Sequence, residues 1–247
     1  MDSAIITGRN SVIEALKAGR SVTKIYITAG KDSQPLLRIR SMAREKGVPV
    51  EPVSADVMRR HARGTHHQDV VAVAAAVAFA DLDEVLSEVQ AKGDVPFLVL
   101  LDGIEDVHNL GAVIRTAECA GAHAVLVPKR RSAPVNETVG KTSAGAVEYM
   151  PVVRIGNTAS FLKKLKKQGF WVIGADMDGE TDYFHSSLTG PLVLVIGSEG
   201  KGISRLVREH CDRLVRIPMF GRVNSLNASV AAALLLYEAV RQRREQA

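Results

Sequence analysis

The sequence is poor in residues that mark several protein classes. Its two cysteines, Cys119 and Cys211, stand too far apart for a metal-binding motif or a disulfide framework, which favours a reducing, cytoplasmic setting. Aromatic residues make up 4% of the chain, which argues against a base-stacking sheet of the RRM type. No apolar run approaches the roughly 20 residues that span a bilayer, and residues 1–4 do not resemble a signal peptide. We therefore expect a cytoplasmic protein without a membrane partner or a bound metal.

The composition otherwise indicates a globular protein with basic patches. Apolar residues occupy 46% and charged residues 24% of the 247 positions, which is enough for a substantial core. Lysine and arginine exceed aspartate and glutamate by 32 − 27 = 5. This excess is clustered in residues 59–67, 129–131, 163–167 and 241–244. Together the clusters suit a polyanion such as a nucleic acid, although each one alone also fits a solvated helix face.

The chain divides into two α/β parts. Residues 1–78 predict a small domain, residues 79–93 an acidic linker with a short helical pattern, and residues 94–247 a larger domain. The elements predicted for the small domain are helices over 10–18 and 35–46 and strands near 24–28, 48–53 and 70–77. Apolar runs predict strands in the larger domain over 97–101, 124–127, 170–174, 192–196 and 214–217. Their alternation with helical segments is typical of a mostly parallel sheet covered by helices.

Two helical patterns in the larger domain place further residues. One buried stripe is predicted to contain Leu110, Val113, Ile114 and Ala117. Arg115 then points about 100° away from that stripe. The C-terminal helix is predicted to bury Val230, Ala233, Leu234 and Tyr237. Its apolar run over 234–236 is broader than one buried stripe requires, which favours a second apolar contact.

Three loops of the larger domain carry candidate site residues. The segment over 102–109 follows a predicted strand, at the sheet edge where ligands bind in open α/β folds. Within it, Asn109 is either a helix N-cap or a site residue. The glycines over 197–202 either let the backbone approach a ligand or form a tight turn. A plain turn does not require the carboxylate of Glu199 between its glycines, so Glu199 is a candidate site residue. The loop over 217–227 opens the last helix, so Ser225 and Asn227 are candidates for N-cap or site.

These three loops, in this order, resemble the three signature motifs of the SpoU (TrmH-like) branch of the SPOUT RNA methyltransferases. The first motif matches at Asn109, Gly111 and Arg115. Residues 8–16 and 67–72 are similar to segments of the family's ribosomal RNA branch, with Asp69 where relatives carry glycine. The resemblance implies a ribosomal-protein-like RNA-binding domain, a methyltransferase domain with a trefoil knot, and a homodimer.

The resemblance also implies an activity: transfer of the methyl group of S-adenosylmethionine to a ribose 2′-hydroxyl, of a guanosine in large-subunit ribosomal RNA. The residues expected to hold the cofactor are Gly197, Gly200, Ile217, Ser225 and Leu226. Those expected to act in catalysis are Asn109, Arg115, Glu199 and Asn227, with Arg9 and Arg115 contacting RNA. Two alternatives stay open, namely a tRNA ribose methyltransferase and a non-catalytic RNA-binding factor in ribosome assembly.

Overall fold

The computed structural model describes residues 3–246, which form two compact units. Unit 1 runs to Ala78 and takes in Val135–Tyr149, while unit 2 contains Phe79–Pro134 and the chain from Met150 onward. Within the described residues, no helix is both long and apolar enough to cross a membrane.

Unit 1 is a four-stranded sheet with helices. The sequence predicts an α/β part with three of these strands but not the strand over residues 3–7. The strand order is β1-β4-β2-β3, with β2 and β3 parallel and the other pairs antiparallel. Its elements are β1 (Ser3–Thr7), α1 (Arg9–Lys17), β2 (Val22–Thr28), α2 (Gln34–Glu45), β3 (Val50–Val53), α3 (Ala55–His61), β4 (Val70–Ala75), α6 (Glu137–Thr142) and the 3-10 turn η1 (Ala146–Glu148). Its core lies between the sheet and helices α1 and α2, where Val12, Ile25 and Ile39 are fully buried.

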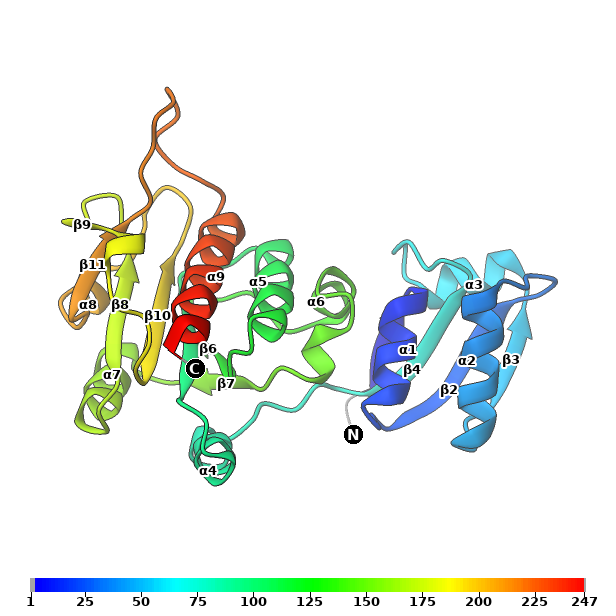
Figure 1. Ribbon diagram of the computed structural model, residues 1–247. Helices are drawn as coiled ribbons and strands as arrows, with labels where there is room; N and C mark the ends of the chain where they lie inside the picture. Colours follow the sequence, from blue (N-terminus) through cyan, green and yellow to red (C-terminus); the bar gives the residue numbers. More distant parts are fainter. Residues whose placement is uncertain (1–2, 247) are drawn as a thin grey trace. The chain divides into compact units, whose positions relative to one another are not determined.

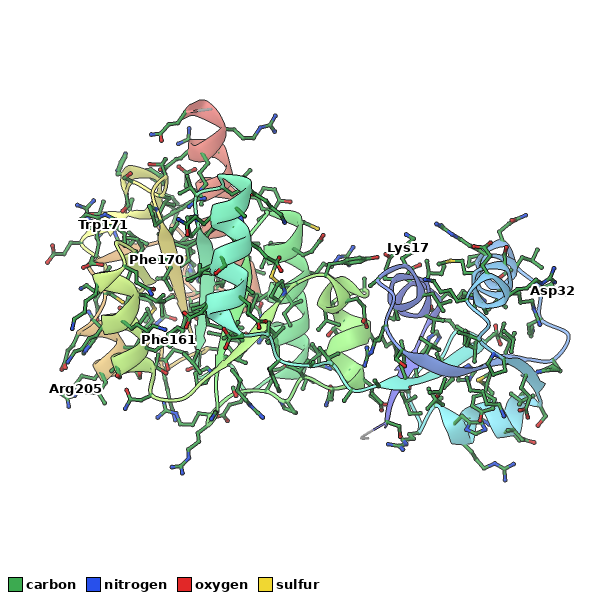
Figure 2. The ribbon with its side chains drawn as sticks, turned by 90° about the horizontal axis from the view of Figure 1, so that it is seen from below. Lys17, Asp32, Phe161, Phe170, Trp171 and Arg205 are labelled. Atoms are coloured by element: carbon green, nitrogen blue, oxygen red, sulfur yellow. The ribbon has the colours of Figure 1, made fainter. Side chains whose placement is uncertain are left out.

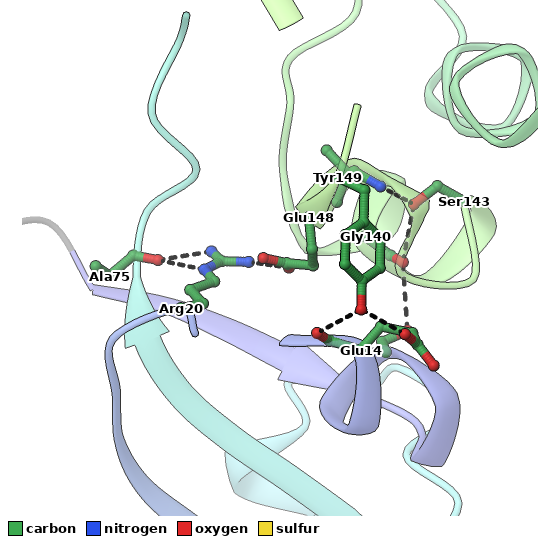
Figure 3. A network of polar contacts seen from close by, with 9 residues as sticks. Glu14, Arg20, Ala75, Gly140, Ser143, Glu148 and Tyr149 are labelled. Carbon is green, nitrogen blue, oxygen red and sulfur yellow. Dashed lines mark hydrogen bonds and ion pairs between the residues drawn. The ribbon is translucent and has the colours of Figure 1, made fainter. Parts of the chain in front are cut away.

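The segment Val135–Tyr149 is held in unit 1 by polar contacts with α1 and the residues after it (Figure 3). The hydroxyl of Tyr149 donates to the Glu14 carboxylate at 2.7 Å. The Arg20 guanidinium pairs with Glu148 at 2.5 Å and donates twice to the Ala75 carbonyl. A Cβ on Gly145 would lie 2.7 Å from the Cβ of Glu14, so glycine permits the close approach. Sequence periodicity did not predict this packing.

Unit 2 is a seven-stranded sheet whose neighbouring strands all pair in parallel (Figure 1). The order is β7-β6-β5-β10-β8-β11-β9. Its strands are β5 (Phe97–Asp102), β6 (Ala124–Pro128), β7 (Val152–Ile155), β8 (Trp171–Ala175), β9 (Thr181–Asp182), β10 (Leu192–Gly197) and β11 (Arg213–Arg216). Its helices are α4 (Leu82–Lys92), α5 (Val107–Cys119), α7 (Thr158–Lys167), η2 (Tyr183–His185), α8 (Arg205–Arg208) and α9 (Ala228–Gln246). The predicted fold class, a mostly parallel α/β sheet beside a smaller α/β part, is confirmed.

The residues expected to link the domains form helix α4 of unit 2. Asp81 caps this helix by accepting the N–H groups of Asp83 and Glu84, and Gly93 ends it with a φ of 74°. Leu82 joins the core cluster of the sheet, which explains why the acidic segment is ordered. That residues 1–78 and 94–247 fold as independent domains remains a prediction.

The prediction for the C-terminal helix is wrong about which face is buried. Helix α9 lies beside α5 and buries a stripe with small residues: Ala228, Ala232, Leu235, Leu236 and Ala239. Val230, Leu234 and Tyr237, which were expected inside, are among the exposed large apolar side chains. The helix is apolar around much of its circumference, so its periodicity does not select one face. The stripe predicted for α5 is confirmed, because Leu110, Val113, Ile114 and Ala117 are all buried.

Candidate active site

A cavity of about 290 Å³ lies in unit 2, at the carboxyl edge of the parallel sheet. Its walls come from the ends of β8, β10 and β11 and the loops that follow them. Parallel strands bring their carboxyl ends to one edge, which is where open α/β sheets bind ligands. The structure places all five residues expected to hold a cofactor in this wall: Gly197, Gly200, Ile217, Ser225 and Leu226.

The glycine-rich loop after β10 is a tight turn with closely spaced limbs. The Ser198 N–H donates to the Gly202 carbonyl at 3.1 Å, and the Gly202 N–H donates back at 2.9 Å. A Cβ on Gly197 would lie 2.2 Å from the carbonyl carbon of Gly202, which no side chain tolerates. The glycines thus form a tight turn whose backbone also lines the cavity, and the approach of a ligand to that backbone stays a prediction.

Asn109 does not cap helix α5, which removes one of its two interpretations. The N-cap is Asp106, whose carboxylate accepts the N–H groups of Asn109 and His108 at 3.1 and 2.5 Å. These two bonds hold the pKa of Asp106 below its usual value. The Asn109 amide is thereby left to reach another loop, and its Nδ2 donates to Oε1 of Glu199 at 3.0 Å.

Glu199 connects the glycine-rich loop to the starts of α5 and α9 through one carboxylate oxygen. Its Oε1 accepts hydrogen bonds from the side chains of Asn109 and Asn227 and from the Ala228 N–H at 3.3 Å. Asn227 also donates to Oδ1 of Asn109 at 2.9 Å, so the three side chains form a closed triangle. The Oδ1 of Asn227 accepts the Ser229 N–H at 3.0 Å, so this residue caps α9 as well. We call Asn109, Glu199 and Asn227 the amide–carboxylate cluster.

Arg115 and Arg9, the two arginines expected to contact RNA, are not part of this cluster. Arg115 is exposed on α5, about 9 Å of helix axis beyond Asn109. Its side chain forms no hydrogen bond or ion pair within residues 3–246. Arg9 belongs to unit 1, where it donates to the Gln68 carbonyl at 3.0 Å and pairs with Asp69 at 3.3 Å. Asp69 has a φ of 67°, a left-handed conformation that favours glycine.

Sequence reasoning missed a charged group in the cavity wall. Asp176 and Asp178 follow β8, and Arg208 of α8 pairs with them at 3.4 and 3.2 Å. The strand-end rule that pointed to the loop after β5 applies equally to Asp176, so the signal was present. Despite these carboxylates, the described residues contain no group of three or more His, Cys, Asp or Glu side chains that could hold a metal ion.

The sequence matches known RNA methyltransferases over nearly its whole length. Residues 96–237 match the SpoU rRNA Methylase family, and residues 5–80 match the RNA 2′-O ribose methyltransferase substrate binding domain. The TrmH family tRNA/rRNA methyltransferase YacO of Bacillus subtilis is 42% identical over 238 residues, which cover 96% of this chain and 95% of YacO.

Two solved structures resemble both units. The SpoU methyltransferase AviRb from Streptomyces viridochromogenes, in complex with the cofactor AdoMet, has a TM-score of 0.81 and 29% identity, covering 98% of this chain and 91% of AviRb. The AdoMet-bound rRNA methyltransferase from Sinorhizobium meliloti has a TM-score of 0.77 and 26% identity, covering 97% of this chain and 87% of that protein.

Proposed function

We propose that this chain methylates the ribose 2′-hydroxyl of a guanosine in large-subunit ribosomal RNA. The chain belongs to the SpoU rRNA Methylase family and is an RNA methyltransferase that uses S-adenosylmethionine. The observation that carries the proposal is the amide–carboxylate cluster, in which Glu199 lines the cavity and holds the side chains of Asn109 and Asn227. Methyl transfer to a hydroxyl requires the oxygen to be aligned and its proton removed, so the enzyme must mainly position groups.

The cavity fits the cofactor in size and lining. Its volume of about 290 Å³ is close to the lower end of the range of roughly 300–1,000 Å³ for small-molecule sites. Gly197 and Gly200 expose backbone to the cavity, while Ile217 and Leu226 supply apolar walls for a planar base. When bound, S-adenosylmethionine supplies an already activated methyl group. We assign the backbone around Gly197, Gly200, Ile217, Ser225 and Leu226 to holding it.

Within the catalytic group, Arg115 is assigned to the substrate rather than to proton abstraction. A guanidinium with a pKa above about 12 is a poor base, but its planar set of donors suits a phosphate and a ribose hydroxyl. Arg115 is exposed and has no partner among the described residues, as this role requires. Asn109, Glu199 and Asn227 fix the loops that orient the hydroxyl, and a phosphate oxygen or water accepts the proton.

The three donors on one oxygen of Glu199 support an orienting role for this side chain. With three donors on it, this oxygen is already committed to neighbouring parts of the chain. Glu199 is therefore assigned to holding Asn109 and Asn227, and not to receiving the proton of the ribose.

Unit 1 is proposed to bind the ribosomal RNA, with Arg9 as a contact. The rRNA-named relative from Sinorhizobium meliloti covers 97% of this chain and so includes this unit, which favours rRNA over tRNA. Unit 1 also carries the basic residues Arg59, Arg60 and Arg63 in and after α3. Because Asp69 already pairs with Arg9, an RNA phosphate must compete with that carboxylate.

A homodimer through unit 2 is proposed on the basis of the second apolar face of α9. Val230, Leu234 and Tyr237 follow each other at spacings of four and three residues and are exposed along one line of the helix. An exposed apolar stripe of this kind on a helix suits an isologous contact with a second copy.

The test of the proposal separates substrate from cofactor. Arg115→Ala should lower single-turnover methyl transfer to ribosomal RNA by orders of magnitude and leave S-adenosylmethionine affinity in calorimetry nearly unchanged. Arg115→Lys should rescue little, because an ammonium cannot reproduce the guanidinium geometry. Arg205→Ala removes an equally charged, exposed side chain of unit 2 and should leave both measurements unchanged.

Each alternative has its own outcome in these assays. A wild-type chain that does not bind S-adenosylmethionine would favour the non-catalytic assembly factor. Mapping 2′-O-methylated riboses in RNA from a deletion strain locates the substrate. Loss of a tRNA modification with intact large-subunit rRNA would contradict the rRNA assignment, and an active Arg115→Ala enzyme would contradict the role of that residue.

A further inference from the structure

A second cavity of about 340 Å³ lies in unit 2, at the opposite edge of the sheet from the proposed active site. Its walls include Trp171, Leu192 and Arg213, which are the first residues of β8, β10 and β11. The first cavity is lined by residues at the carboxyl ends of the same strands, including Ala175, Gly197 and Val215. The four steps from Trp171 to Ala175 along β8 span roughly 13 Å, at about 3.3 Å per residue, so this is a separate site.

Trp171 offers an exposed aromatic surface on a rigid backbone. The side chain is on the outside of unit 2 (Figure 2), and the residue is 57% exposed, although an indole is normally largely buried. The backbone N–H of Trp171 donates to the Pro191 carbonyl at 2.8 Å, and the residue pairs with Leu192 in the parallel ladder. The neighbouring Phe170 is buried, which anchors the strand start. The indole is therefore presented by a fixed strand rather than by a loop.

Arg213 lies on the same face of the sheet as Trp171. It is paired with Ile173 in the ladder, and Ile173 is two residues after Trp171, so all three side chains point to one side. A strand spacing of about 4.8 Å and a two-residue rise of about 6.6 Å place the two Cα atoms roughly 8 Å apart. In the described chain the Arg213 guanidinium has neither an ion pair nor a hydrogen bond, whereas the nearby Lys166 is paired with Asp212.

The remaining wall combines polar and apolar residues and carries no negative charge. Of the ten described residues that line the cavity, none is acidic, and Arg213 supplies the charge. Ser186 is 2% exposed, and its hydroxyl has no hydrogen-bond partner within the described residues, which is unusual for a buried polar group. Ser187 and Thr189 add hydroxyls 3.3 Å apart.

We propose that this cavity binds a nucleotide of single-stranded RNA, with its base stacked on Trp171 and its phosphate on Arg213. Sequence-tolerant binding of single strands combines aromatic stacking with basic groups along the backbone, and these two groups are present on one face. An acid-free wall and an excess of five basic residues in the chain favour a polyanion over a protein segment. The site would hold RNA at a distance from the methylated nucleotide, and it does not depend on the proposed reaction.

The experiment uses Trp171 as its own reporter, because it is the chain's single tryptophan. Short oligoadenylate is added to the full-length protein while indole emission is recorded, and the same oligonucleotide carrying a dye reports total binding by anisotropy. We expect saturable quenching. Arg213→Ala should weaken the quenching titration about tenfold, the effect of losing one charged hydrogen-bonded contact. Arg205→Ala, which removes an exposed arginine outside the cavity, should leave it unchanged.

Two further variants address the indole itself. By anisotropy, Trp171→Leu should weaken binding while Trp171→Phe retains most of it, because a phenyl ring still stacks. Calorimetry with S-adenosylmethionine should be identical for all these variants, which separates this site from the proposed active site. Adenosine monophosphate in place of the oligonucleotide distinguishes a free nucleotide from a strand, since a strand site binds the oligonucleotide more tightly. Binding by anisotropy without quenching, or equal losses in Arg213→Ala and Arg205→Ala, would overturn the proposal.

Discussion

Gly197→Ala is expected to weaken cofactor binding while leaving the fold in place. The added Cβ would lie 2.2 Å from the carbonyl carbon of Gly202, 2.5 Å from its oxygen and 2.4 Å from the Ile203 nitrogen. Non-bonded heavy atoms prefer about 3.5–4.0 Å, so the limbs of the turn must separate by more than about 1 Å. All the atoms in conflict are backbone atoms, and no side-chain rotation relieves the overlap.

The size of the effect follows from what the separation breaks. The turn is closed by the two hydrogen bonds between Ser198 and Gly202, each worth about 0.5–1.5 kcal/mol net. Losing both hydrogen bonds destabilises the loop conformation that lines the cavity by about 1–3 kcal/mol. Because the cofactor binds this conformation, its affinity should fall roughly 5- to 150-fold. Calorimetry with S-adenosylmethionine measures this, and thermal unfolding checks that the chain remains folded.

Two further alanine variants separate steric overlap from other effects. Gly200 has a φ of +79° but open space around its Cβ, so Gly200→Ala should cost only backbone strain, about 1 kcal/mol. Gly156, in the connection before α7, has neither constraint and serves as the control. If Gly197→Ala bound the cofactor as tightly as Gly156→Ala, the loop would not hold the cofactor in the way we describe.

The remaining predictions concern assembly and stability. Leu234→Asp on the exposed face of α9 should raise the dimer dissociation constant at least tenfold in sedimentation, because burying one leucine contributes about 1.5–3 kcal/mol. Leu37→Asp, at a more exposed leucine of unit 1, should leave the constant unchanged. In unit 1, Arg20→Met should lower the free energy of unfolding, measured by chemical denaturation, by about 3–5 kcal/mol, because it leaves the buried Glu148 carboxylate unpaired. Glu148→Gln should lower it far less. Burial raises the pKa of Glu148, so its stabilising contribution is present at low pH and lost as the pH rises through the folded value. Wild type should therefore lose stability relative to Glu148→Gln as the pH rises above about 4.5, the usual pKa of this carboxyl, and a constant difference would contradict this assignment.

The sequence predicted elements better than it predicted their mutual packing. The α5 stripe and the buried strands follow from local periodicity, which one sequence displays directly. The contact between Asn109, Glu199 and Asn227 was expected only through the family motifs and the rule that parallel strand ends share an edge. Periodicity could not select the buried face of α9, because both of its faces are apolar. A two-residue strand such as β9 carries no pattern of its own, since pairing with β11 defines it.

The place of Val135–Tyr149 in unit 1 bears on how this enzyme can be recombined with its relatives. These residues stand between β6 and β7 of unit 2 in the sequence, so the chain passes between the units three times. A single crossover after Ala78 would separate Glu14 from its native Tyr149 and Arg20 from its native Glu148. It would also leave Val139, fully buried in the intact chain, against an unmatched surface. A functional chimaera therefore requires two segments to be exchanged together, and changes in either one constrain the evolution of the other.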